Sequence, residues 1–291
     1  MRLSSRQKGI IFLMLSSFFF AVMALFVKLA GDLPVMQKAF FRNSVAAVVA
    51  TILLLRTKSG FKFDKKNLPF FFLRAIFGTT AIIANYYAIQ NLTLADATIL
   101  IKLAPFFTII FSFIFLKEKI RPYQIIAILI AFAASVLIIK PGFSTSDTKH
   151  VLTALAGAAG GMLAGAAYTC VRHLSLKKEN SKFIVFFFSM FASIVLLPFA
   201  TVYYQPMSLP QLFFLLSAGV AGALAQFSLT TAYGYAPSRS ISVFDYSQIV
   251  FSTILGLIAF SEFPDALSLT GIAIIFSVAL FMFLHNEKKQ N

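Results

Sequence analysis

The sequence has no tryptophan, one cysteine and three histidines among its 291 residues. A single thiol excludes an intramolecular disulfide, and Cys170 lies in an apolar run rather than among other metal ligands. No glycine-rich phosphate-binding loop, no acidic pair within an apolar run and no nucleophile–base motif is present. We therefore expect no bound metal, no cofactor and no enzymatic activity.

Acidic residues are also scarce, because 10 Asp and Glu stand against 25 Lys and Arg and give a formal net charge of +15. An excess of this size is typical of many nucleic-acid-binding proteins. Here the basic residues are separated by long apolar runs and form no continuous basic face. Nucleic acid is therefore not an expected partner.

Apolar side chains dominate the composition. The chain is 59% hydrophobic and 12% charged, with a mean hydropathy of +0.86, which is more apolar surface than one soluble core of this length buries. A helix needs about 20 mostly apolar residues to cross a lipid bilayer, and such segments occur at residues 9–29, 36–55, 68–89, 95–116, 122–140, 152–171, 183–203, 210–233, 240–260 and 267–285. Open sheet edges cannot be satisfied in lipid, so we predict an all-α membrane protein with ten transmembrane helices.

The second half of the chain resembles the first at an offset of 144 residues. This offset places Gly222 on Gly78 and Glu262 on Glu118, and the apolar segments of the two halves fall in step. Each half has five segments, so the second copy enters the membrane from the opposite side. We predict two inverted five-helix repeats within one membrane domain, residues 1–143 and 144–291.

The basic residues between the spans predict the orientation of the chain. Lys28, Lys38, Lys140 and Lys149 fall on the side opposite the termini, whereas many more basic residues fall on the side of the termini. Loops rich in Lys and Arg stay in the cytoplasm. Both termini are therefore predicted to be cytoplasmic, in a multi-pass protein of the cytoplasmic (inner) membrane.

The ends of the two halves, residues 88–119 and 232–264, share a pattern. Each has a loop of small residues, a helix with a proline or an aromatic residue in mid-span, and a closing acid, Glu118 or Glu262. With the chain length and the five-plus-five repeat, this pattern resembles the drug/metabolite transporter superfamily, in particular the EamA-type ten-helix transporters. The first span departs from many members in lacking tryptophan. The resemblance implies a secondary transporter.

Four ionisable side chains fall inside the predicted spans: Arg42, Arg74, Lys102 and Asp245. Such charges are costly unless they face the interior of the bundle. Counting along the spans places Lys102 and Asp245 on the order of 13 Å apart along the membrane normal. We therefore predict a gate from Arg74, Asp245 and Lys102, in which Arg74 lies level with Asp245, and an outer carboxylate or phosphate site at Arg42 and Lys102. Alternatively, the two arginines extend along their stems to the lipid headgroups.

Polar side chains recur at helical spacing on three spans, as expected for cavity walls. The stripes are Asp245, Gln248 and Ser252; Gln226, Thr230 and Tyr233; and Thr79, Tyr86 and Gln90, with Asn85 beside them. Tyrosines suit a cation, an aromatic ring or a sugar. The predicted substrate-binding residues are Lys102, Asp245, Tyr86, Asn85, Tyr168, Gln226, Thr230, Tyr246, Gln248 and Arg42. Alternatively, the stripes only form hydrogen bonds between helices.

Gly157, Gly161 and Gly165 follow one another at four-residue spacing in the sixth span. This spacing predicts close helix packing, either within a monomer or across a homodimer.

The function favoured by these features is secondary active transport of a small polar metabolite, such as an amino acid or a nucleoside-like compound, across the cytoplasmic membrane. We expect alternating access with proton or other gradient coupling, in the direction of efflux. One alternative is an uptake carrier of the same fold, for example for S-adenosylmethionine. Another is a membrane-embedded lipid-handling enzyme.

Overall fold

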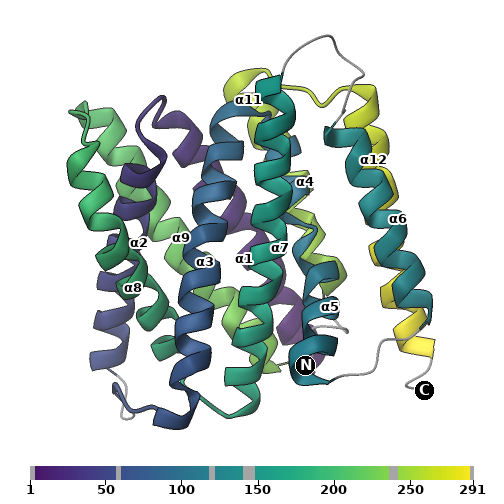
Figure 1. Cartoon of the computed structure of the whole chain (residues 1–291), viewed down its shortest axis with the longest axis horizontal. Helices are drawn as coiled ribbons and strands as arrows, with labels where there is room; N and C mark the ends of the chain where they lie inside the picture. The colour runs from purple at the N-terminus through teal and green to yellow at the C-terminus, as the bar shows by residue number, and fades with distance from the viewer. Residues whose placement is uncertain (1–3, 57–59, 118–121, 140–147, 236–241, 289–291) are drawn as a thin grey trace.

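The computed structural model describes residues 4–56, 60–117, 122–139, 148–235 and 242–288, and the regular structure in these ranges is helical. The helices are α1 Ser5–Leu29, α2 Val35–Leu55, η1 Lys65–Asn67, α3 Leu68–Asn91, α4 Leu94–Ile101, α5 Ala104–Leu116, α6 Pro122–Ile139, α7 Thr148–Leu176, α8 Ser181–Val202, α9 Leu209–Tyr235, η2 Ser242–Tyr246, α11 Ser247–Phe260 and α12 Ala266–Lys288. They run side by side as one bundle, with both termini at the same end (Figure 1).

Seven apolar helical segments of the described chain are long enough to cross a membrane, and three shorter apolar helices complete the set. Their bounds fall within a few residues of most predicted spans. For example, the second predicted span covers residues 36–55, and α2 runs from Val35 to Leu55. The prediction of ten helices in two inverted five-helix repeats is confirmed.

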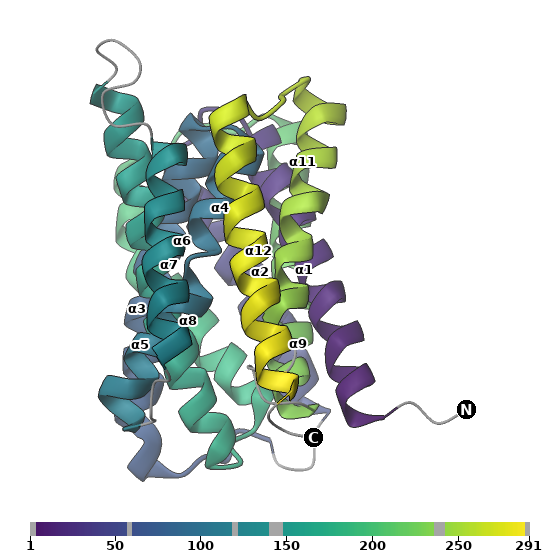
Figure 2. The same cartoon turned by 90° about the vertical axis from the view of Figure 1, so that its right-hand side faces the viewer.

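The helix pairs show how the repeats interlock. The 144-residue offset relates α1 to α7 and α3 to α9, so the close pairs α1–α9 and α3–α7 are equivalent contacts between opposite halves. The pairs α2–α8 and α6–α12 each join a helix to its own repeat mate. The α6–α12 pair lies along the right-hand edge of the bundle in Figure 1 and faces the viewer in Figure 2. The molecule therefore has the two-fold relation that an inverted repeat requires.

Two of the predicted continuous spans are broken, and the breaks are at repeat-equivalent positions. The fourth span divides at Lys102 and Leu103 into α4 and α5, because Pro105 in the first turn of α5 cannot donate to the carbonyl of Ile101. The ninth span begins with the 3₁₀ turn η2 before α11. The Tyr246 hydroxyl donates to the carbonyl oxygen of Lys102 over 3.1 Å, so a hydrogen bond joins the two breaks.

The glycine stripe of α7 packs inside the monomer. A Cβ atom on Gly161 would lie 2.5 Å from the carbonyl oxygen of Leu100, and one on Gly165 would lie 2.6 Å from Cβ of Phe107. Any larger side chain would therefore push α4 and α5 away from α7. The close approach holds the broken fourth span against the rest of the bundle.

The orientation of the bundle leads to a labelling prediction. With buried Cys170 replaced by alanine, cysteines at exposed Lys62 or Lys178 should resist an impermeant thiol reagent in intact cells, because basic loops stay in the cytoplasm. Cysteines at exposed Lys149 or Ser208 should be labelled. Labelling of position 62 from outside, with protection of position 149, would reverse the predicted orientation.

Candidate functional site

An ion pair joins the two broken spans at the centre of the bundle. The Lys102 ammonium lies 2.6 Å from Oδ2 of Asp245, and the two side chains are 6% and 8% exposed. The Ser17 hydroxyl lies 3.1 Å from both Oδ1 and the backbone oxygen of Asp245. A buried charge pair of this kind is stable only because both partners and their hydrogen bonds are in place.

The predicted separation of Lys102 and Asp245 was wrong, and the register of the helices explains the error. The Thr98 hydroxyl donates to the Ser252 hydroxyl over 3.0 Å, and a Cβ atom on Gly256 would lie 3.4 Å from Cβ of Leu94. The start of α4 is therefore level with Gly256 rather than with the end of α11. Lys102 consequently faces the turn that holds Asp245.

The buried arginines do not extend to lipid headgroups, because Arg42 is 1% exposed and Arg74 is 3% exposed. Both guanidinium groups lie against the ring of Phe188, with Cζ–centroid distances of 5.8 Å for Arg42 and 3.9 Å for Arg74. Arg74 and Asp245, which were predicted to lie level, do not pair with each other, since Asp245 pairs with Lys102 and Arg74 donates to Oε1 of Gln226 over 3.3 Å. Their common level stays a prediction.

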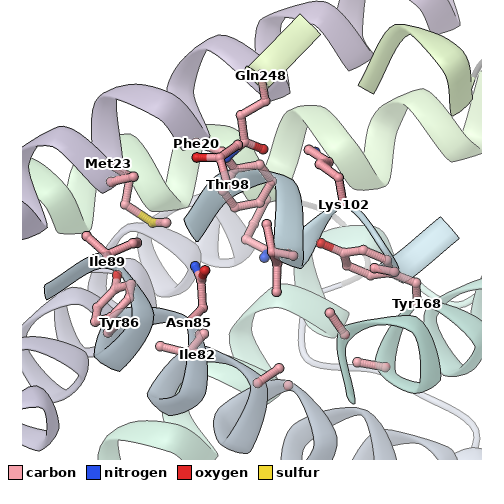
Figure 3. Close-up of a pocket in the computed structure, with 18 of the residues that line it drawn as sticks. Phe20, Met23, Ile82, Asn85, Tyr86, Ile89, Thr98, Lys102, Tyr168 and Gln248 are labelled. Carbon is pink, nitrogen blue, oxygen red and sulfur yellow. The ribbon is translucent and has the colours of Figure 1, made fainter. Parts of the chain in front are cut away.

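These charged residues line a central cavity (Figure 3), where Asn85, Lys102, Tyr168 and Gln248 gather around one space. Most of the predicted site residues line it: Lys102, Asp245, Tyr86, Asn85, Tyr168, Gln226, Gln248, Arg42 and Arg74. Its volume is ≈ 70 Å³, well below the about 300–1,000 Å³ of typical ligand pockets. A metabolite would therefore require the cavity to widen.

Thr230 and Tyr246 are outside the lining of this cavity. The Thr230 hydroxyl donates to the backbone oxygen of Gln226 in the preceding turn, over 2.8 Å. Tyr246 is 1% exposed and donates to Lys102, as described above. Both residues are thus hydrogen-bonded to the backbone of residues that do line the cavity.

Sequence reasoning missed several cavity residues. Thr98 lies one turn before Lys102, and that spacing could have identified it. Phe20, Met23 and Phe188 also line the cavity, but they belong to long apolar runs in which nothing distinguishes them from lipid-facing residues. Ser17 likewise gives no sign in the sequence that it binds Asp245.

A second set of contacts joins three segments at the end of the bundle opposite the termini. The Lys28 ammonium contacts Oε1 of Glu262 and donates to the carbonyl oxygen of Leu92 over 2.8 Å. The other carboxylate oxygen of Glu262 accepts the Leu94 amide over 3.0 Å, at the first turn of α4. This cluster joins α1, the start of α4 and the segment after α11. The repeat mate Glu118 lies outside the described residues.

A second hollow lies between the central cavity and the end of the bundle that carries the termini. It is lined by Thr108, Tyr168, Arg172, Ser175, Leu176, Tyr233 and Gly234, and its volume is ≈ 250 Å³. Tyr168 lines both spaces. Access to the central cavity from this end therefore passes Tyr168.

Comparison with known proteins agrees with the repeat and the fold. The model of the EamA-like transporter family matches twice, at residues 7–140 and 151–284, which are the same 144 residues apart as Lys102 and Tyr246. One solved crystal structure matches with a TM-score of 0.69 over 97% of this chain and 99% of that chain, at 16% identity.

Three curated relatives are named as carriers of different kinds. The pseudopaline exporter CntI of Pseudomonas aeruginosa is 32% identical over 92% of this chain and 93% of its own. Solute carrier family 35 member G1 of Mus musculus is 31% identical over 88% of this chain and 73% of its own. The S-adenosylmethionine uptake transporter of Rickettsia bellii is 26% identical over 87% of this chain and 84% of its own. Because the family model covers nearly the whole chain and a relative above 30% identity spans it, the chain belongs to the EamA-like transporter family, within the drug/metabolite transporters.

Proposed function

We propose that the chain is a secondary active transporter that moves a small polar metabolite through the central cavity by alternating access. The main support for this proposal is the ion pair of Lys102 and Asp245, whose charged atoms lie 2.6 Å apart. The pair joins the broken spans of the two repeats beside the cavity. Substrate sites of inverted-repeat transporters lie at such discontinuous helices near the bilayer midplane.

Alternating access is supported by the difference between the two ends. Lys28, Glu262 and the start of α4 close the end opposite the termini, whereas the second hollow leads toward the other end past Tyr168. With the termini in the cytoplasm, this is an arrangement closed to the outside. The repeat relation then predicts a second state in which the outer end opens and the inner end closes.

The charge of the cavity indicates the kind of substrate. Arg42, Arg74 and Lys102 against Asp245 leave an excess of positive charge in a site screened from water. A substrate with an anionic group, such as an amino acid or a nucleoside-like metabolite, would balance it. Tyr86, Asn85 and Gln226 line the same cavity and could bind its polar groups.

We propose efflux driven by proton or other gradient coupling, as the relation to a named exporter favours. Uptake is the second candidate, favoured by the relation to a named uptake transporter. In either case we place the protein in the cytoplasmic membrane as a monomer or homodimer.

Purified protein in liposomes tests this function. A melting-temperature screen against a metabolite library would first identify a ligand, because a ligand that binds the folded state stabilises it. Labelled ligand should then enter the vesicles with saturation, and unlabelled ligand inside should accelerate it. A pH gradient should drive accumulation if protons couple. Conversion of the ligand into a product would instead support the membrane-enzyme alternative.

A further inference from the structure

We propose that Arg42 and Arg74 form a subsite for two anionic groups, so that the cavity selects substrates carrying two carboxylates over substrates carrying one. This inference rests on the proposed transport function and narrows its substrate class. It assigns Arg74 to substrate binding rather than to a gate.

Among the residues that the structure describes, neither arginine has a counter-ion. They are 1% and 3% exposed, and within the described part of the chain no carboxylate forms an ion pair with either one. Asp245, whose carboxylate lines the cavity, is paired with Lys102. A buried cation normally pairs with an anion, because its desolvation costs several kcal/mol. The missing partners are expected to come from a ligand.

Most N–H donors of the two guanidinium groups have no acceptor within the described residues, which agrees with a ligand that binds both arginines. Each guanidinium has five N–H donors. Within the described ranges, the side chain of Arg42 makes one hydrogen bond, from Nη1 to Asn43 Oδ1 over 2.6 Å, and that of Arg74 makes one, to Gln226. Nε of each is buried without a partner. Tyr86 also lines the cavity, and its buried hydroxyl has no hydrogen-bond partner in the described part of the chain.

The backbone makes room for both guanidinium groups at repeat-equivalent places. A Cβ atom on Gly78 would overlap Nη1 of Arg74, and one on Gly222 would lie 2.7 Å from Nε of Arg42. The 144-residue offset relates these two glycines. The face of Phe188 supports both groups from another side. Packing therefore holds the arginines in place without neutralising them.

The count of charges sets the preference for two anionic groups. Lys102 and Asp245 neutralise each other, and the two arginines remain. Each guanidinium can hold one carboxylate by a pair of parallel hydrogen bonds. A substrate with a single carboxylate would leave the other arginine uncompensated.

Binding of matched acids to the purified full-length protein tests the subsite. The probes are succinate, glutarate and adipate, each compared with its monoamide at constant ionic strength by calorimetry. Charge-assisted hydrogen bonds predict that at least one diacid binds roughly tenfold more tightly than its monoamide. Arg42→Gln and Arg74→Gln should each reduce this preference to about twofold or less, because one site for a carboxylate is lost. Arg74→Lys keeps the positive charge but loses the planar guanidinium, so it should retain part of the preference for the diacid. Arg56 is exposed, and the control variant Arg56→Gln should leave the preference for the diacid unchanged.

The failure of this inference can be told apart from failure of the transport function. If the protein carries its substrate in liposomes but no diacid binds more tightly than its monoamide, the subsite is refuted and transport stands. The subsite is likewise refuted if the preference for the diacid survives in both glutamine variants. If diacids bind with the predicted preference but no substrate crosses the bilayer, transport is refuted and the subsite stands.

Discussion

Replacing Asp245 with alanine is expected to reduce transport to the background of empty liposomes. The change leaves the Lys102 ammonium, 6% exposed, without its carboxylate. Breaking one side of a buried pair costs about 3–5 kcal/mol, and the change also removes the side-chain acceptor Oδ1 of Asp245 from the Ser17 hydroxyl. Lys102→Ala should have the same effect on transport, because it leaves Asp245 buried and unpaired.

A charge-balanced double variant separates folding from function. Lys102→Met with Asp245→Asn removes both charges at similar volume, so it should recover most of the melting temperature lost by either alanine variant. It should remain inactive if the pair takes part in transport. The exposed Lys65→Ala is the control and should change neither property. Normal flux through both alanine variants would place the site elsewhere.

Asp245→Asn alone addresses the coupling ion. If Asp245 carries the coupling proton, the asparagine variant should still exchange labelled for unlabelled substrate and should no longer respond to a pH gradient. Gradient-driven accumulation by this variant would assign coupling to another group.

The spans could be predicted from the sequence because a bilayer imposes a length on every apolar run. The breaks within them were harder to predict. Pro105 signals a kink in the fourth span, but η2 has no proline or glycine, and it became visible only as the repeat mate of the first break. The local sequence therefore predicts the break in the fourth span but not the equivalent break in the ninth.

The charged residues of the site could also be found from the sequence, but their partners could not. A charge in an apolar run is conspicuous, so Arg42, Arg74, Lys102 and Asp245 were all identified. Which of them meet depends on how far two antiparallel helices slide past each other. That slide is set by contacts such as Thr98 with Ser252, which leave no trace in the hydropathy pattern.

A disulfide between Leu94→Cys and Gly256→Cys is expected to lock the bundle closed at its outer end and stop transport. A Cβ atom on Gly256 would lie 3.4 Å from Cβ of Leu94, close to the Cβ–Cβ distance of about 3.5–4.5 Å in disulfides. The bond would join α4 of the first repeat to α11 of the second, next to the contact of Lys28 with Glu262. Opening toward the outside separates these two helices in an alternating-access cycle.

The measurement uses a Cys170→Ala background, so that the new pair contains the only thiols. Oxidation should abolish flux while ligand binding from the cytoplasmic side persists, because the hollow past Tyr168 is at the other end. Reduction should restore flux, and each single cysteine variant should transport under both conditions. Full transport with the crosslink formed would mean that α4 and α11 do not part during the cycle. The two repeats would then not move about the Lys102–Asp245 pair, and the mechanism inferred from the 144-residue offset would be refuted.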